Sequence, residues 1–128
     1  MNTHYSVTLA MLAGLGLGAV AVERLHAQAR PPVYQVVEIE PSNTEAYVKD
    51  YVPKAQAAIK AAGGKFLAAG GKTTTIEGEP PKPRVVVIQW DSVEKIQAYR
   101  DSAAFKDLLP LRSSLAKFRS YAVEAVPQ

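Results

Sequence analysis

Tyr99, Ser102 and Arg112 are the polar residues whose types and spacing best suit the recognition of a small molecule. Tyr99 and Ser102 are three positions apart, so they share one side of a helix that continues through both. The guanidinium group of Arg112 is planar and presents paired donors that match the two oxygens of a carboxylate. Together these side chains can line one polar pocket for an anionic or aromatic ligand.

Each of these three residues also has a purely structural interpretation. Arg112 can form an ion pair with a nearby acidic residue, since most arginines are structural or solvated. Tyr99 can belong to the core with its hydroxyl group hydrogen-bonded, and Ser102 can cap the helix that follows it. The acidic residues available to Arg112 are Asp91, Asp101 and Asp107.

Glu38, Tyr34 and Trp90 are further candidates for a ligand site. In an extended strand, Glu38 shares a face with Tyr34 and Val36. A carboxyl group among apolar neighbours has a raised pKa, which suits a proton acceptor. Alternatively, Glu38 lies at the margin of a sheet or pairs with a lysine. Trp90 ends a strongly apolar strand, where it either stacks on a ligand or belongs to the core or to a subunit interface.

The residue types that the chain lacks limit its chemistry. It has no Cys, and its histidines, His4 and His26, and its methionines, Met1 and Met11, all precede residue 30. A domain that begins there cannot hold a Ser-His-Asp triad or a Cys nucleophile. It also lacks the usual nitrogen and sulfur ligands of zinc and copper. We therefore expect no metal ion and no cofactor, and any general acid or base must be Asp, Glu, Lys or Tyr.

Residues 1–29 have the layout of a secretory signal peptide. The segment Val7–Val22 is an uncharged run of 16 residues, which is shorter than the roughly 20 apolar residues of a transmembrane helix. Ala27 and Ala29 then provide a small-x-small cleavage motif. Because no Lys or Arg precedes the apolar run, an uncleaved anchor and a cytoplasmic protein are the alternatives. We expect residues 30–128 to be a mature domain that is periplasmic or secreted.

Hydrophobic patterning predicts the element order βαββαβ in this domain. Ser42 and Glu45 have the spacing of a capping box at the start of the first helix. Pro53 must kink or restart that helix, and Pro110 is expected to break one short helix and begin the next. The expected strands are 33–41, 65–71, 84–90 and 120–126, and the expected helices are 42–62, 91–100 and two short segments that meet at residue 110 and end near residue 118.

This order is typical of a ferredoxin-like α+β sandwich, in which helices cover one face of a four-stranded antiparallel sheet. The third expected strand is apolar on both faces: Val85 and Val87 point one way, and Val86, Ile88 and Trp90 point the other way. Leaving a whole apolar face exposed costs many kcal/mol at roughly 25 cal/mol per Å². The simplest cover is a second copy, so we predict a homodimer through the sheet face. No basic run indicates a nucleic-acid partner.

The segment Arg84–Arg112 carries a distinctive combination of features. A strand opens with Arg84 and ends with Trp90, a helix carries Tyr99, and the pattern S-x-x-F-x-x-L-x-P-x-R follows from Ser102 to Arg112. This combination resembles the domain-of-unknown-function family thirteen-thirty (DUF1330), within the dimeric α/β-barrel superfamily. The resemblance extends over about residues 33 to 126 and implies a dimer. Its relatives include cofactor-free monooxygenases, isomerases, haem-degrading enzymes and binding modules, so it implies a fold and not an activity.

Three functions are compatible with these features. The first is an exported dimeric binding module for a small anionic or aromatic molecule, which Arg112, Tyr99 and Ser102 recognise while Trp90 or Tyr34 stacks on it. The second is a cofactor-independent enzyme of the monooxygenase or isomerase kind, with Glu38 or a tyrosine as proton acceptor. The third is a structural dimer without a ligand. The absence of His from the expected mature domain favours the first, since His is the commonest general base.

Overall fold

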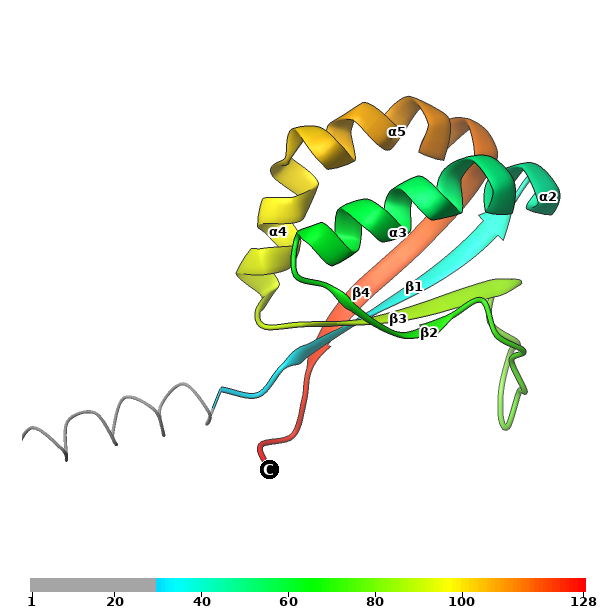
Figure 1. Cartoon of the computed structure of the whole chain (residues 1–128). Coiled ribbons are helices and arrows are strands. Elements are labelled where there is room, and N and C mark those ends of the chain that lie inside the picture. Colours follow the sequence, from blue (N-terminus) through cyan, green and yellow to red (C-terminus); the bar gives the residue numbers. More distant parts are fainter. Residues whose placement is uncertain (1–29) are drawn as a thin grey trace, which may run out of the picture. The chain divides into compact units, whose positions relative to one another are not determined.

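Four antiparallel strands form a sheet in the computed structural model, which describes residues 30–128. The strands lie in the order β2-β3-β1-β4, and the helices cover one face of the sheet (Figure 1). This arrangement confirms the expected ferredoxin-like α+β fold. The elements are β1 (Val33–Pro41), α2 (Thr44–Ala46), the π-helix η1 (Tyr47–Tyr51), α3 (Val52–Ala61), β2 (Lys65–Ala69), β3 (Arg84–Trp90), α4 (Val93–Asp101), α5 (Ala103–Leu115) and β4 (Ala116–Glu124).

The signal peptide predicted for residues 1–29 lies outside the described residues and stays a prediction. In the part of the chain that the structure describes, no helix is both long enough and apolar enough to cross a membrane.

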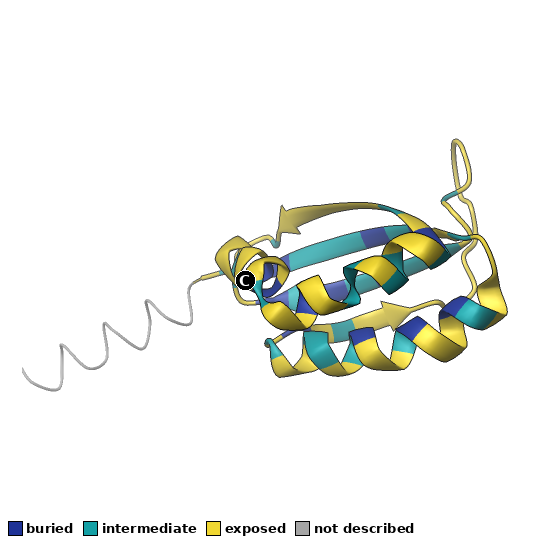
Figure 2. Ribbon diagram, turned by 90° about the horizontal axis from the view of Figure 1, so that it is seen from above, coloured by how far each residue is buried: buried dark blue, intermediate teal, exposed yellow. Residues whose placement is uncertain are grey.

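The core lies between the sheet and the helices. In each strand the side chains alternate between the two faces, and the inward positions of the two central strands are mostly apolar. From above, the buried residues lie on the central strands and on the helix sides that face them (Figure 2). The buried strand residues are Val33, Val37 and Ile39 from β1, and Val86, Ile88 and Trp90 from β3.

The first helical segment runs without a break from Thr44 to Ala61, but it changes its hydrogen bonding on the way. The N–H of Val52 donates to the carbonyl of Tyr47, five residues back, which is the bond of a π-turn. Pro53 is the second residue of α3, directly after the π-turn, so the hydrogen bonding changes where the proline has no N–H to donate. The helix cap differs from the expectation: the side chain of Asn43, not of Ser42, accepts from the N–H of Ala46 at 3.0 Å.

Pro110 does not break a helix as the sequence suggested. It lies inside α5, which runs continuously to Leu115, and β4 begins at Ala116 rather than at Ser120. Pro110 is exposed, so the carbonyl of Lys106 that loses its donor lies on the solvent side and can be hydrated. The helix is therefore able to accommodate the proline.

The face of the sheet opposite the helices is mainly apolar. Three cross-strand rows lie on it, and the helices leave it uncovered (Figure 1). The central row joins Val87, Val36 and Tyr121, and the row beside it joins Gln89, Tyr34 and Val123. The third row, Val85, Glu38 and Arg119, contains an ion pair.

Candidate functional site

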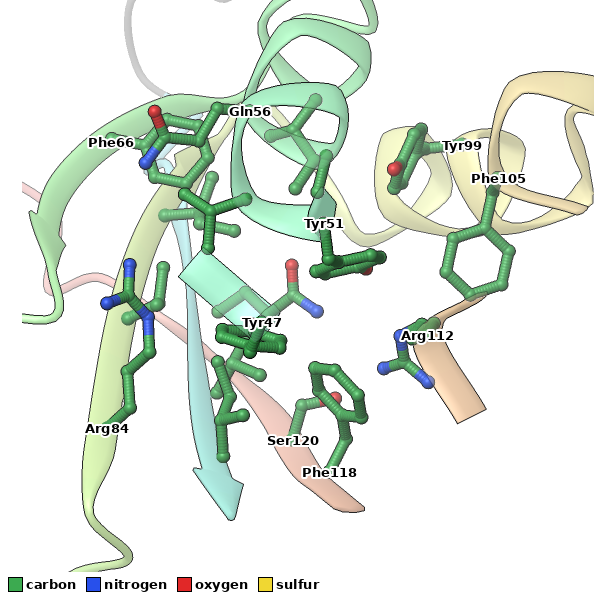
Figure 3. Close-up of a pocket in the computed structure, with 18 of the residues that line it drawn as sticks. Tyr47, Tyr51, Gln56, Phe66, Arg84, Tyr99, Phe105, Arg112, Phe118 and Ser120 are labelled. Atoms are coloured by element: carbon green, nitrogen blue, oxygen red, sulfur yellow. The ribbon is translucent and has the colours of Figure 1, made fainter. Parts of the chain in front are cut away.

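A cavity of about 70 Å³ lies between the sheet and the helices. Its walls come from all four strands and from η1, α3, α4 and α5. The lining is mostly apolar, with polar groups at a few positions (Figure 3). The main polar residues are three arginines and three tyrosines: Arg84, Arg100, Arg112, Tyr47, Tyr51 and Tyr99.

Three aromatic rings form one wall of this cavity. The ring centroids of Tyr47 and Tyr51 are 5.3 Å apart, and those of Tyr47 and Phe118 are 6.2 Å apart. Tyr51 meets Phe118 edge to face at 6.0 Å. The π-turn of η1 sets the positions of the two tyrosines, because both belong to that single widened turn. The sequence thus builds an aromatic surface beside β1 and β4.

Tyr99 presents an unpaired hydroxyl group in this cavity. Only 7% of Tyr99 is exposed, and its hydroxyl oxygen has no hydrogen-bond partner among the protein atoms of residues 30–128. Its ring packs against Trp90 and, edge to face, against Phe105, with centroid distances of 5.9 and 5.4 Å. These contacts fix the ring and leave its buried hydroxyl group with unused hydrogen-bonding capacity.

The arginines of the cavity contact aromatic rings rather than carboxylates. The Cζ atom of Arg112 is 3.6 Å from the centroid of Phe118, and that of Arg84 is 5.7 Å from the centroid of Tyr47. Arg100 lies over the ring of Phe105 at 4.6 Å. Such cation–π contacts hold each guanidinium group against an aromatic ring.

None of these three arginines has a carboxylate within 4.0 Å in the described part of the chain. The ion pairs there join Arg119 to Glu38, and Lys82 to Glu40 at 3.6 Å. The ion pair of Arg112 with Asp91, Asp101 or Asp107, which the sequence left open, is therefore absent. No Asp or Glu belongs to the described lining of the cavity, so its charged groups are all positive.

Burial keeps the cavity tyrosines protonated. It raises the pKa of Tyr47 and of Tyr99 to about 12 and also raises the pKa of Tyr51. The nearby arginines act in the opposite direction and are outweighed by the loss of hydration. At neutral pH the three hydroxyl groups therefore serve as hydrogen-bond donors and are poor proton acceptors.

The six candidate residues from the sequence separate into two groups. Arg112 and Tyr99 both line the cavity. Ser102 caps α5 instead: its hydroxyl accepts from the N–H of Phe105 at 3.3 Å and donates to the carbonyl of Tyr99 at 2.5 Å. Trp90 is 1% exposed in the core, and its indole N–H donates to Gln35 at 3.0 Å.

Glu38 and Tyr34 lie on the opposite face of the sheet from the cavity. Glu38 accepts hydrogen bonds from the backbone N–H of Lys82 at 3.0 Å and from the guanidinium of Arg119. These bonds, the one from Lys82 foremost, lower the pKa of Glu38. The raised pKa expected from the sequence is therefore wrong, since Glu38 is hydrogen-bonded rather than isolated among apolar groups.

Sequence reasoning did not assign Arg84, Arg100, Tyr47 and Tyr51 to the site. A signal was present for Arg84, which opens the best strand, and for Tyr47, which lies on the apolar side of its helix. The strand register brings Arg84 into the site, because Arg84, Ile39 and Phe118 form one cross-strand row on the helix side. That register depends on pairing between distant segments, which the local sequence does not reveal.

Solved structures of other proteins share this fold. A protein of unknown function from Rhodopseudomonas palustris matches with a TM-score of 0.63 and 14% identity, over 77% of this chain and 85% of that chain. The cofactor-independent oxygenase SnoaB from Streptomyces nogalater matches with a TM-score of 0.57 and 11% identity, over 77% and 96%. A possible oxidoreductase from Bacteroides thetaiotaomicron matches with a TM-score of 0.51 and 17% identity, over 76% and 100%. These likenesses show the fold alone.

Comparison by sequence identifies the family. A search of curated proteins finds no match. The model of the "Domain of unknown function (DUF1330)" matches residues 32–126, which include every strand and helix described above. The chain therefore belongs to the DUF1330 family.

Proposed function

We propose that this domain binds a small anionic molecule with an aromatic or conjugated body in the cavity between the helices and the sheet. The observation that carries the proposal is the placement of Arg84, Arg100 and Arg112 around an apolar cavity whose described lining has no carboxylate. A partly buried guanidinium without a counter-ion is costly. A bound anion would neutralise this charge through charge-assisted hydrogen bonds.

The apolar part of the cavity supports an aromatic or conjugated body for the ligand. Tyr47, Tyr51 and Phe118 present ring faces and edges to the same space as the guanidinium of Arg112 (Figure 3). A flat ligand can pack on these rings while its acidic group meets the arginine. In this arrangement Tyr99 donates its free hydroxyl to the ligand, and Ser102 positions Tyr99 through the hydrogen bond to its carbonyl.

Cofactor-independent oxidation of such a ligand is the second candidate function, and the fold likeness to SnoaB is what favours it. That chemistry would require a proton acceptor beside the ligand. Glu38 lies on the other face of the sheet, and burial raises the pKa of Tyr47 and Tyr99 to about 12. The described residues therefore support binding better than proton abstraction.

The domain organisation proposed with this function follows from the sequence. Residues 1–29 would be a cleaved signal peptide, and residues 30–128 would act in the periplasm or outside the cell. A second copy would cover the apolar face of the sheet on the side away from the cavity. The ligand site would then be complete within one chain, because its described lining comes from the helix side of the sheet.

Titration with benzoate and with benzamide tests the proposed function. The two probes have the same ring, but only benzoate is an anion. We expect the domain to bind benzoate more tightly than benzamide. We expect Arg112→Gln to lower the affinity for benzoate about tenfold or more and to change the affinity for benzamide little. Isothermal titration calorimetry or amide chemical shifts of residues 30–128 would measure both affinities.

Arg119→Gln is the matched control, because Arg119 is paired with Glu38 on the other face of the sheet. It should leave benzoate affinity unchanged. Equal benzoate affinity in the wild type and in Arg112→Gln would reject the site. Native mass spectrometry of the protein from its own source would add a direct check, since a retained anionic compound would appear as extra mass.

A further inference from the structure

The cavity has cationic groups at two separate ends. In Figure 3 Arg84 lies on one side of Tyr47, near Gln56 and Phe66, and Arg112 lies on the other side, near Phe105 and Phe118. The strand register gives the spacing: Arg84 and Phe118 flank Ile39 in one row across three strands. Two strand spacings separate them, which is about 10 Å between backbones. The Cζ atom of Arg112 lies 3.6 Å from the centroid of the Phe118 ring.

Arg84 is held in place at its end of the cavity. A Cβ atom built on Gly70 would approach Nη1 of Arg84, so the guanidinium packs directly on the backbone of Gly70. On another side it meets the ring of Tyr47 at 5.7 Å. Its Nε atom is buried and has no hydrogen-bond partner among the protein atoms of residues 30–128. Arg84 is thus a fixed, unneutralised cation with a free donor.

The other end of the cavity is also fixed and cationic. Arg112 and Arg100 both lie over the ring of Phe105, at 5.4 and 4.6 Å. Close by, Tyr99 offers a free hydroxyl whose ring is packed against the same Phe105. One acidic group placed at this end would pair with Arg112 and leave Arg84 without a counter-ion. The aromatic rings of Tyr47 and Phe118 lie between the two ends (Figure 3).

We propose that the ligand is a planar molecule with an acidic group at each end, so that one group meets Arg84 and the other meets Arg112. This inference rests on the proposed function and specifies its ligand class as an aromatic or conjugated dicarboxylate. The acidic group beside Arg84 meets its guanidinium, whose planar fork of donors suits a carboxylate. The flat body packs on the rings of Tyr47, Tyr51 and Phe118.

Matched pairs of probes test the second acidic group. Terephthalate is compared with 4-carbamoylbenzoate, and isophthalate with 3-carbamoylbenzoate, because each pair differs only in a carboxylate or carboxamide at the far end. We expect at least one diacid to bind about tenfold or more tightly than its carboxamide partner. Arg84→Gln should abolish this preference and leave the affinity of the carboxamide nearly unchanged.

Arg119→Gln again serves as the control and should keep the preference, since it lies on the opposite face of the sheet. If Arg84→Gln fails to fold, Arg84→Met provides a second variant, because it removes the charge and keeps a long apolar stem at this position. It too should remove the preference for the diacid. Folding of each variant is checked by circular dichroism.

The outcomes separate this inference from the proposed function. If neither diacid exceeds its carboxamide while benzoate still depends on Arg112, the ligand is a monoanion and only the inference fails. If a diacid preference survives in Arg84→Gln, Arg84 is not its partner and the inference is overturned. If benzoate, the diacids and the carboxamides all fail to bind, the proposed function fails as well.

Discussion

The hydroxyl group of Tyr99 is a polar atom that the fold buries without satisfying. An unsatisfied buried donor costs about 1–3 kcal/mol, and the same group gains that amount back when a partner arrives. Residues of this kind are retained where binding outweighs stability. At the residue scale, the unpaired hydroxyl of Tyr99 therefore supports the proposed ligand more strongly than its position in the aromatic cluster would alone.

Replacing Tyr99 by Phe should separate stability from binding. The ring contacts with Trp90 and Phe105 remain in Tyr99→Phe, so we expect the free energy of unfolding in urea to stay the same or to rise by about 1 kcal/mol. Benzoate affinity should fall. Tyr121→Phe, on the opposite face, should change neither quantity. A clear loss of stability in Tyr99→Phe would show that the hydroxyl has a structural partner.

Glu38 should make stability depend on pH. Its hydrogen bonds to Lys82 and Arg119 lower its pKa below 4.5 in the folded state. The resulting stabilisation is present above the unfolded pKa and is lost as pH falls through the folded pKa. We expect Glu38→Gln to be less stable than the wild type at pH about 7, and the difference to shrink at pH about 3.

Glu40→Gln is the matched control for Glu38→Gln. Glu40 and Lys82 form an exposed ion pair, and such pairs contribute only about 0–1 kcal/mol. Urea unfolding at both pH values measures each variant. A gap between wild type and Glu38→Gln that widens toward acid pH would contradict the assigned sign of the pKa shift.

At the scale of elements, the sequence predicts the features that local patterns determine. It does not predict those that contacts between distant segments determine. The alternation in β3 and the capping residues around α4 are local signals, and both the strand and the helix appear where expected. The expected break at Pro110 was wrong because a helix tolerates proline when the unpaired carbonyl faces solvent. Which side of a helix faces solvent is decided by tertiary packing, which a local pattern does not specify.

The candidate site shows the same division. Tyr99 and Arg112 were found because their residue types and helical positions suit a pocket. Arg84 and Phe118 line the site only because β1 pairs with β3 and β4. The π-turn that orients Tyr47 could not be foreseen from a sequence that reads as an ordinary helix with a proline.

Pro110→Ala should stabilise α5. Proline in a helix interior costs about 3 kcal/mol relative to alanine, and its rigidity in the unfolded chain returns about 0.4–1 kcal/mol. Because Pro110 is exposed and loses no packing, we expect the free energy of unfolding to rise by about 2 kcal/mol. Pro53→Ala, in the first turn of α3, should not stabilise. Urea midpoints that fall in Pro110→Ala would show that the proline suits its local helix geometry.

At the scale of the whole molecule, the two faces of the sheet pose different problems. The helices cover one face and enclose the cavity, while the other face presents two mainly apolar cross-strand rows. Tyr121 and Val123 on this face are 49% and 52% exposed. These exposed apolar side chains support the proposed dimer interface. The ion pair of Glu38 with Arg119 lies in the row beside these two rows.

A lysine in the middle of this face tests the proposed dimer. Val87 lies in the central row with Val36 and Tyr121, so a second sheet would bury the charge of Val87→Lys without a partner. We expect residues 30–128 to sediment as a dimer and Val87→Lys to raise the dissociation constant about a hundredfold or more. Val48→Lys, on the exposed side of η1, should remain dimeric. A Val87→Lys dimer of native affinity would place the interface elsewhere. A wild-type monomer would overturn the proposed dimer.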